Sequence, residues 1–201
     1  MAESYVIGVD FGSDSVRALI VNTETGENVG QGVACYPRWK AGLYQHPEYS
    51  IFRQHPLDYL ESLEKCITTA LAELTEEQKD HVIGIGVDTT GSTPVPVDKN
   101  GTPLALLDEF AENENAMFFL WKDHAAAAEA DEINKLFRNN SENDYTKYQG
   151  DYSAEWYWAK ILYAVRHDEA IRQAAYTWEE HCDWMTGILC GETRPEKIYH
   201  G

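Results

Sequence analysis

Four residues suited to phosphate chemistry lie together between two apolar runs near the start of the chain: Asp10, Gly12, Ser13 and Ser15. Gly12 can adopt backbone angles that other residues avoid, and it lets a ligand approach closely. Consecutive N–H groups in such a turn can point at one anion, and the serine hydroxyls would add donors. Asp10 could hold Mg²⁺ through water, because Mg²⁺ prefers oxygen ligands and keeps much of its hydration. A plain turn built from the same residue types is the alternative interpretation.

The segment around this turn, VDFGSDSVRALIVN, resembles the first phosphate motif of the superfamily of sugar kinases, heat-shock proteins and actin. In that motif, Asp-x-Gly-Thr/Ser-x-Ser joins the first two strands of a ribonuclease-H-like domain. The resemblance implies ATP and Mg²⁺ as cofactors, with the Mg²⁺ held by Asp10 through water. The residues that it assigns to the phosphates are Asp10, Gly12, Ser13, Ser15 and Arg17. Arg17 could instead pair with a nearby carboxylate.

Three later stretches resemble the FGGY family of carbohydrate kinases: IGIGVDTTGSTPVPVDKNGTPL, FFLWKDH and GDYSAEWYWAKILY. With the phosphate motif and EEHCDWMTGILCGE, the resemblance extends from Tyr5 to Glu192. It implies a kinase that phosphorylates a small-molecule sugar with ATP. Within the family, the set is most similar to kinases of a ketopentose, with L-ribulose and arabinose catabolism expected. Xylulose, a related pentulose or polyol, and a non-catalytic sugar-binding module are the alternatives.

The resemblance implies a sugar pocket that contains Gly91, Ser92, Trp121, Asp123 and Glu155. The indole of Trp121 would form a plate for the C–H face of the sugar. The carboxylates of Asp123 and Glu155 would accept bonds from the sugar hydroxyls. Small residues at 91 and 92 would leave room for a pentulose, where related glycerol kinases carry large charged side chains.

Each of these residues also has an ordinary structural interpretation. Trp121 follows an apolar stretch and could belong to the core. Asp123 and Ser153 could be N-caps of the helices that follow them. Glu155 could be a first-turn acid that the helix dipole favours. We interpret the neighbouring aromatic residues as packing residues: Trp156, Tyr157 and Trp158. The histidines show no metal-ligand spacing, and we assign them no role.

The elements that must position these residues follow an α/β order. Strands are predicted at Tyr5–Val9, Val16–Asn22 and Gly30–Tyr36, the first of them buried on both faces. Pro56 suits a helix start, and leucines spaced by three and four residues follow it as far as Leu74. A fourth strand, HVIGIGVD, ends on Asp88. This order predicts a ribonuclease-H-like domain of the actin-like ATPase superfamily, with a mixed central sheet flanked by helices.

The second half of the chain is predicted to be mainly helical. A loop at Trp39–Arg53 precedes the long helix, and a short strand, PVPVD, follows the fourth strand. Helices are expected at Ala125–Phe137, Ala154–Arg166, Glu169–Trp178 and Glu180–Leu189, with a polar loop at Asn139–Gly150.

The composition excludes some classes of partner. The 201 residues carry 34 acidic and 16 basic side chains, a formal charge of −18, which argues against nucleic-acid binding. No apolar run approaches the roughly 20 residues of a membrane span, and no signal peptide is apparent. The four cysteines form no CxxC pair, which is typical of free thiols in a reducing compartment. A cytoplasmic protein is therefore expected.

The resemblance also implies that parts of a complete kinase lie outside residues 1–201. The base aspartate and the C-terminal ATP-binding domain find no match, so these residues are expected to form an N-terminal sugar-binding domain. Alone, that domain should be inactive, because phosphoryl transfer depends on positioning both reactants. Asp88 is a local candidate for a substitute base, although we interpret it as a strand-end residue. An exposed apolar face would favour a homo-oligomer.

Overall fold

The computed structural model describes residues 3–140 and 144–198. These residues divide into two compact units. The first joins the stretch through Leu43 with His55–Thr90, and the second joins Tyr44–Gln54 with the stretch from Gly91 onward. The N-terminal sugar-binding domain expected over residues 1–201 stays a prediction. No helix in the described part of the chain is both long and apolar enough to cross a membrane.

The first unit is built on a mixed four-stranded sheet with the order β3-β2-β1-β6. Its strands are β1 (Tyr5–Phe11), β2 (Ser15–Asn22), β3 (Asn28–Cys35) and β6 (Val82–Thr89). The first three form the predicted antiparallel meander, and β6 pairs parallel with β1. The unit's helices are α1 (Pro37–Lys40), α2 (Pro56–Leu71) and α3 (Glu76–Asp80).

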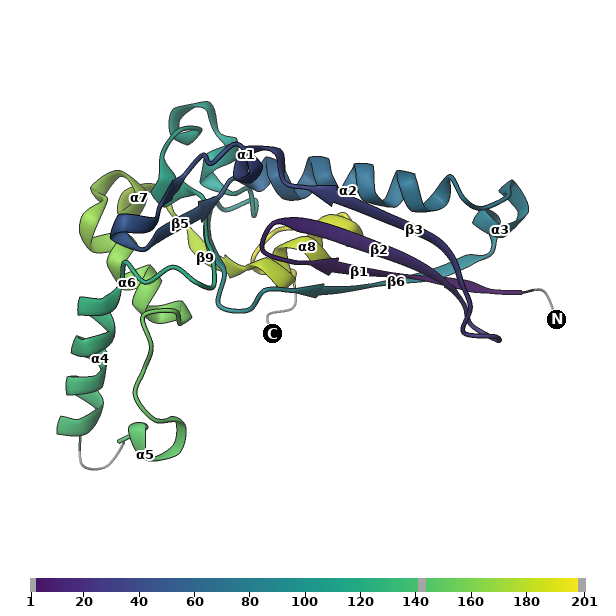
Figure 1. Ribbon diagram of the computed structural model, residues 1–201. Coiled ribbons are helices and arrows are strands. Elements are labelled where there is room, and N and C mark those ends of the chain that lie inside the picture. The colour runs from purple at the N-terminus through teal and green to yellow at the C-terminus, as the bar shows by residue number, and fades with distance from the viewer. Residues whose placement is uncertain (1–2, 141–143, 199–201) are drawn as a thin grey trace. The chain divides into compact units, whose positions relative to one another are not determined.

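Helix α2 covers one face of this sheet and runs alongside β2 and β3 (Figure 1). Pro56 occupies its first turn, and the ring of His55 accepts a hydrogen bond from the N–H of Leu57. Because α2 covers only one face, buried and exposed residues alternate along β1, so the prediction that this strand is buried on both faces was wrong. The opposite face is exposed within the described residues, including Leu19 and Val33.

Glycines in β3 set how closely α2 approaches. A Cβ added at Gly32 would lie 2.1 Å from the carbonyl oxygen of Cys66, and one added at Gly30 would lie 2.6 Å from that of Ala70. The helix therefore rests on the sheet through its small side chains. Its buried face is centred on Tyr59, Leu63, Cys66 and Ala70, and most of the predicted leucine stripe is only half-buried.

The second unit contains two small sheets. Strands β4 (Gln45–His46), β5 (Ile51–Gln54) and β8 (Phe118–Phe119) form one, and β7 (Pro94–Val97) pairs with β9 (Thr177–Glu180) in the other. The helices of the unit are α4 (Ala127–Asn139), α5 (Thr146–Gln149), α6 (Tyr157–His167), α7 (Glu169–Ala174) and α8 (His181–Cys190). Four short 3-10 helices are η1 (Pro47–Tyr49), η2 (Leu104–Leu106), η3 (Asp108–Phe110) and η4 (Glu114–Ala116).

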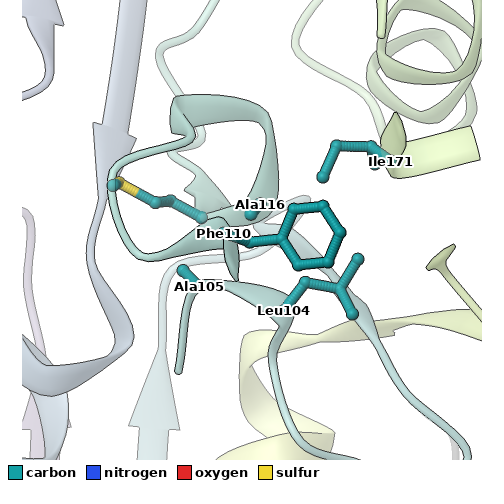
Figure 2. Close-up of a cluster of buried hydrophobic side chains, with 6 residues drawn as sticks. Leu104, Ala105, Phe110, Ala116 and Ile171 are labelled. Carbon is teal, nitrogen blue, oxygen red and sulfur yellow. The ribbon is translucent and has the colours of Figure 1, made fainter. Parts of the chain in front are cut away.

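Part of this unit's core is formed by irregular segments. Figure 2 shows the ring of Phe110 beside Leu104 and Ile171, with Ala105 and Ala116 in the same cluster. Four apolar side chains of this cluster thus come from the 3-10 turns and one from α7.

Three expectations need correction. The predicted helix at Glu169–Trp178 ends at Ala174, because the backbone turns extended at Ala175 and Thr177–Glu180 pairs with β7. The predicted loop at Trp39–Arg53 contains β4 and β5. The polar loop expected at Asn139–Gly150 contains α5, and residues 141–143 within it lie outside the described residues.

Candidate functional site

The predicted phosphate turn connects β1 to β2 in the first unit. The N–H of Gly12 donates to the carbonyl of Ser15 at 2.9 Å. The hydroxyl of Tyr36, the residue that follows β3, donates to the carbonyl of Gly12 at 3.1 Å and supports the turn from one side. Ser15 is buried, and its hydroxyl donates to the carboxylate of Asp14 at 3.0 Å. The turn is therefore held by its own backbone and by Tyr36, a residue to which sequence analysis gave no role.

Gly12 serves this turn differently from the expectation. It is not among the glycines with positive φ, so it does not use backbone angles closed to other residues. A Cβ at this position would lie 3.3 Å from the carbonyl oxygen of Ser15 and 3.7 Å from the guanidinium of Arg17. A side chain here would crowd the carbonyl oxygen of Ser15, so glycine lets the backbone of the turn pack tightly, and the close approach of a ligand stays a prediction.

A charged cluster follows at the same end of the sheet. The guanidinium of Arg17 donates to the carboxylate of Asp10 at 2.9 Å, and both side chains are about half exposed. Arg17 thus has the carboxylate partner that was one of its two interpretations. Asp10 lies opposite Asp88 in the parallel register of β1 and β6, and Asp88 is exposed. The strand order therefore brings two carboxylates and one guanidinium to neighbouring strands.

This donor set is compatible with the expected Mg²⁺. Asp10 is a half-exposed carboxylate, with one oxygen accepting from Arg17, and it can reach a hydrated cation. In the described part of the chain, no group of three or more His, Cys, Asp or Glu side chains forms a metal cage. The geometry thus fits a water-mediated contact better than a fully protein-ligated ion.

The predicted sugar residues all lie in the second unit. Ser92 has a φ of 51°, in the left-handed region that costs a residue with a side chain about 1 kcal/mol. Its carbonyl accepts a hydrogen bond from the ammonium of Lys160 at 2.5 Å. A Cβ added at the neighbouring Gly91 would meet nothing within 4 Å, so space is open beside this turn. The next residue, Thr93, donates its N–H to the carboxylate of Glu180 at 2.8 Å.

Trp121 is 42% exposed, which sets aside the interpretation that it is a core residue. It follows β8, and its carbonyl lies 3.5 Å from the same ammonium of Lys160. The carbonyl of Leu120 accepts from that ammonium at 3.0 Å. The turns that carry Ser92 and Trp121 are therefore brought together by one lysine that sequence analysis did not identify.

Asp123 lies deeper than expected. It is fully buried, and its carboxylate accepts from the guanidinium of Arg53, from the N–H of Phe52 and from the N–H of Ala125. These bonds make Asp123 a support of the tryptophan turn in this structure. Helix α4 begins only at Ala127, so Asp123 caps the preceding turn rather than the helix. Its contact with a sugar hydroxyl stays a prediction.

Glu155 reaches the tryptophan segment through a histidine. Its carboxylate lies 2.8 Å from Nε2 of His124, and both side chains are partly exposed. The other ring nitrogen of His124 lies 2.7 Å from the carbonyl of Lys122. Glu155 precedes α6, whose N-cap is Trp156, so neither it nor Ser153 occupies the helical position expected. His124 had no recognisable sequence signal, because its partner is 31 residues away (155 − 124).

An aromatic pocket of about 530 Å³ lies beside Ser92. Trp156, Tyr157 and Trp158 contribute to its lining, and Trp158 is 64% exposed. Aromatic rings exposed next to a polar turn suit the C–H faces of a sugar. Trp156 also packs against the ring of Tyr152, so the interpretation of these aromatic residues as packing residues stays a prediction, as does a sugar contact.

Comparison with known proteins agrees with these arrangements. The N-terminal domain of the FGGY family of carbohydrate kinases matches residues 5–196. A ribulokinase of Vibrio parahaemolyticus is 52% identical over 200 residues, which are 99% of this chain and 35% of that protein. A ribulokinase of Mycolicibacterium smegmatis is 38% identical and covers 94% of this chain. This chain thus spans about a third of the length of these relatives.

A xylulose kinase from Bifidobacterium adolescentis has a similar structure, with a TM-score of 0.72 over 98% of this chain and 38% of that one. At 18% sequence identity, this similarity shows the fold alone, which is the actin-like ATPase fold expected. The family match extends over nearly the whole chain and includes both the phosphate turn and the tryptophan segment. The chain therefore belongs to the FGGY family of carbohydrate kinases and corresponds to its N-terminal domain.

Proposed function

We propose that this chain is the sugar-binding part of an ATP-dependent kinase that converts L-ribulose to L-ribulose 5-phosphate. The observation that carries the proposal is the 52% identity to a ribulokinase along essentially the whole chain. In this reaction, a sugar hydroxyl oxygen forms a bond to the γ-phosphorus of ATP and the bond to ADP breaks. The hydroxyl proton passes to a base, for which the family resemblance implies an aspartate outside these residues.

The second unit supplies the sugar contacts in this proposal. The exposed indole of Trp121 covers the apolar face of the pentulose. Glu155, half exposed and oriented by His124, accepts hydrogen bonds from its hydroxyls. The open space beside Gly91 and Ser92 admits a chain of five carbons. Asp123 supports the turn that carries Trp121, and its carboxylate binds the sugar only if its ion pair with Arg53 breaks.

The first unit supplies the phosphate contacts. The turn at Gly12–Ser15 would lie against the ATP phosphates, and Arg17 would exchange its bond with Asp10 for one with a phosphate oxygen. Asp10 would hold Mg²⁺ through water, and the ion would neutralise charge on the phosphates. These assignments are supported by the exposure of both side chains beside the tight turn at Gly12.

The decisive experiment compares two proteins. ADP formation is measured with ATP, Mg²⁺ and a panel of pentuloses, for this chain and for a fusion of it to the remainder of the V. parahaemolyticus ribulokinase. We expect turnover from the fusion alone, fastest with L-ribulose, because a single unit cannot position both reactants. Preference for xylulose would redirect the substrate assignment, and inactivity on every sugar would refute it.

A sugar-binding module without catalysis is the second candidate. It is favoured by one observation, that all the predicted sugar residues lie within a single compact unit. In that case this chain would bind L-ribulose in calorimetry while the fusion stays inactive. A chain that binds no pentulose, beside an active fusion, would argue against it.

Two further features complete the proposal. The described cysteines are all free, which supports a reducing compartment such as the cytoplasm. The exposed apolar face of the four-stranded sheet supports self-association into a homo-oligomer. Neither nucleic acid nor membrane is a proposed partner, because the net charge of −18 opposes both surfaces.

A further inference from the structure

Lys160, in the second unit, is unusual for a lysine because its side chain is completely buried. Its ammonium lies 2.5 Å from the carbonyl oxygen of Ser92, 3.0 Å from that of Leu120 and 3.5 Å from that of Trp121. Lysine is almost never fully buried unless its charge is compensated, since removing an ammonium from water is costly. Here three carbonyl dipoles provide the compensation, and an ammonium has three N–H donors to match them.

These carbonyls belong to two turns that are far apart in sequence. One turn follows β6 and carries Ser92, whose backbone is in the left-handed region. The other follows β8 and carries the half-exposed Trp121. Non-glycine residues with such backbone angles persist only where surrounding contacts hold them. The hydrogen bond from the ammonium of Lys160 to the carbonyl of Ser92, at 2.5 Å, is well placed to hold that conformation.

We propose that Lys160 is a positioning residue for sugar binding: its ammonium connects the turn at 91–93 to the turn at 120–123 and fixes the distance between Ser92 and Trp121. The inference rests on the proposed function, because it takes these turns to be the sugar pocket. Lys160 itself does not contact the sugar. It acts through the carbonyl groups of two backbone segments.

The protonation of Lys160 gives this role a pH dependence. Burial lowers its pKa to about 7, while the nearby carboxylates of Glu180 and Glu155 act in the opposite direction and Arg53 acts with burial. A neutral amine has two donors and a lone pair that faces the carbonyl oxygens. The connection between the turns should therefore weaken as the pH rises through about 7.

The test measures the turns first without sugar and then with it. Hydrogen-exchange protection factors of the amides at 91–93 and 120–124 are recorded from pH 5.5 to 8.5 for the wild type, Lys160→Met, Lys160→Arg and the control Lys135→Met, an exposed lysine on α4. We expect Lys160→Met to lose at least roughly tenfold protection in both turns, the factor that one lost charged hydrogen bond corresponds to. Lys135→Met should match the wild type.

The arginine variant separates positioning from a general loss of stability. A guanidinium stays charged over this range, so Lys160→Arg should remove the pH step that the wild type shows. L-ribulose affinity, measured by calorimetry on the same proteins, should follow the protection of the two turns and fall roughly tenfold in Lys160→Met. Unchanged protection and affinity in Lys160→Met would overturn the proposal.

The two proposals fail in different ways. If neither this chain nor the fusion to the remainder of the ribulokinase binds a pentulose at any pH, the proposed sugar site is overturned, and with it the role of Lys160 in binding. A wild type that binds L-ribulose as tightly as Lys160→Met overturns the role of Lys160 alone. A wild type whose turns show no pH step, beside a Lys160→Met variant that unfolds, likewise overturns the positioning role, because a merely structural lysine explains both results.

Discussion

Two aspartate–arginine pairs in this chain differ in burial, which lets the effect of environment be measured directly. Asp123 and Arg53 are both buried, whereas Asp10 and Arg17 are both about half exposed. We expect Asp123→Asn to cost about 3–5 kcal/mol of unfolding free energy, because it leaves the guanidinium buried without its charged partner. Urea denaturation followed by tryptophan fluorescence would measure the loss.

The matched control is Asp10→Asn, which removes a carboxylate from an exposed pair. Such pairs contribute roughly 0–1 kcal/mol, so the unfolding midpoint should barely move. Equal losses in the two variants would mean that Arg53 finds another partner when Asp123 is neutral. In the fusion enzyme, Asp10→Asn should instead lower activity through the loss of Mg²⁺ binding.

Glu179 is expected to make stability depend on pH. Its side chain is buried, and neither carboxylate oxygen has a hydrogen-bond partner among the described residues. Burial raises its pKa to about 8, and the nearby Asp183 and Asp98 act in the same direction. A group whose pKa is raised on folding holds its proton in the folded state, so its contribution is complete below its unfolded pKa and is lost as the pH rises to about 8.

Unfolding free energy should therefore fall between about pH 4.5 and pH 8, with a slope from this group of at most about 1.4 kcal/mol per pH unit. In Glu179→Gln this part of the slope should disappear, because the amide does not titrate. Thermal unfolding at a series of pH values would show the difference. Parallel profiles for the two proteins would place the titration on another group.

At the scale of elements, the contact between α2 and β3 depends on the absence of a side chain. Gly32→Ala would bring its Cβ against the helix backbone at Cys66, which cannot move like a flexible side chain. We expect a loss of about 1–3 kcal/mol, the range for overpacked cores, measured by chemical denaturation. Gly8→Ala in β1 is the matched control, because a Cβ added at Gly8 would meet nothing within 4 Å.

The outcome of this pair tests how rigidly the helix rests on the sheet. If Gly32→Ala unfolds at the same denaturant concentration as Gly8→Ala, α2 must move away from β3 at this point without losing its packing against the sheet. A shift of that kind should also change the environment of Cys66, whose thiol donates to the carbonyl of Gly32. The reactivity of that thiol toward a disulfide reagent would report it.

Sequence patterns predicted the elements whose signals are local. Apolar periodicity and Pro56 located α2, and the turn residues located the first three strands and β6. The buried face of α2 differs from the predicted leucine stripe, because the small residues Cys66 and Ala70 lie against glycines in β3. The spacing of leucines in the sequence does not reveal such a contact. Strand β9 was hidden inside a helical pattern because its partner, β7, is about 80 residues earlier.

The site was predictable to the same degree. The family resemblance identified Trp121 and Glu155 by segments that carry their own motif, and the structure exposes both. The burial of Asp123 depends on Arg53, which is 70 residues away in the sequence. The role of Lys160 depends on carbonyl groups, which every residue has, so no sequence pattern could have indicated it.

At the scale of the whole molecule, the uncovered sheet face is the feature that should govern behaviour in solution. A groove of about 1020 Å³ runs over this face, and its lining includes Leu19, Val33 and Ile85. Exposed apolar patches of this kind favour association. We expect self-association to increase with salt, because screening reduces repulsion between chains that each carry −18.

Light scattering coupled to size-exclusion chromatography would test this expectation for the wild type and for Val33→Lys. The variant places a charge on the face at a side chain that is already 60% exposed, so folding should be unaffected. It should shift the population toward monomer. A wild type that is monomeric at high salt would contradict the proposal, as would a variant that associates as strongly.

The parallel pairing of β1 with β6 has a consequence for the order of folding. The phosphate turn belongs to a hairpin whose strands adjoin in sequence, so it can form early and locally. The pairing of Asp10 with Asp88 must close a loop of 78 residues (88 − 10) that includes α2. Pulse-labelling hydrogen exchange should therefore protect β1 and β2 before β6. The end of the sheet that carries the turn would then be assembled in two stages, with the turn first and the second carboxylate, Asp88, last.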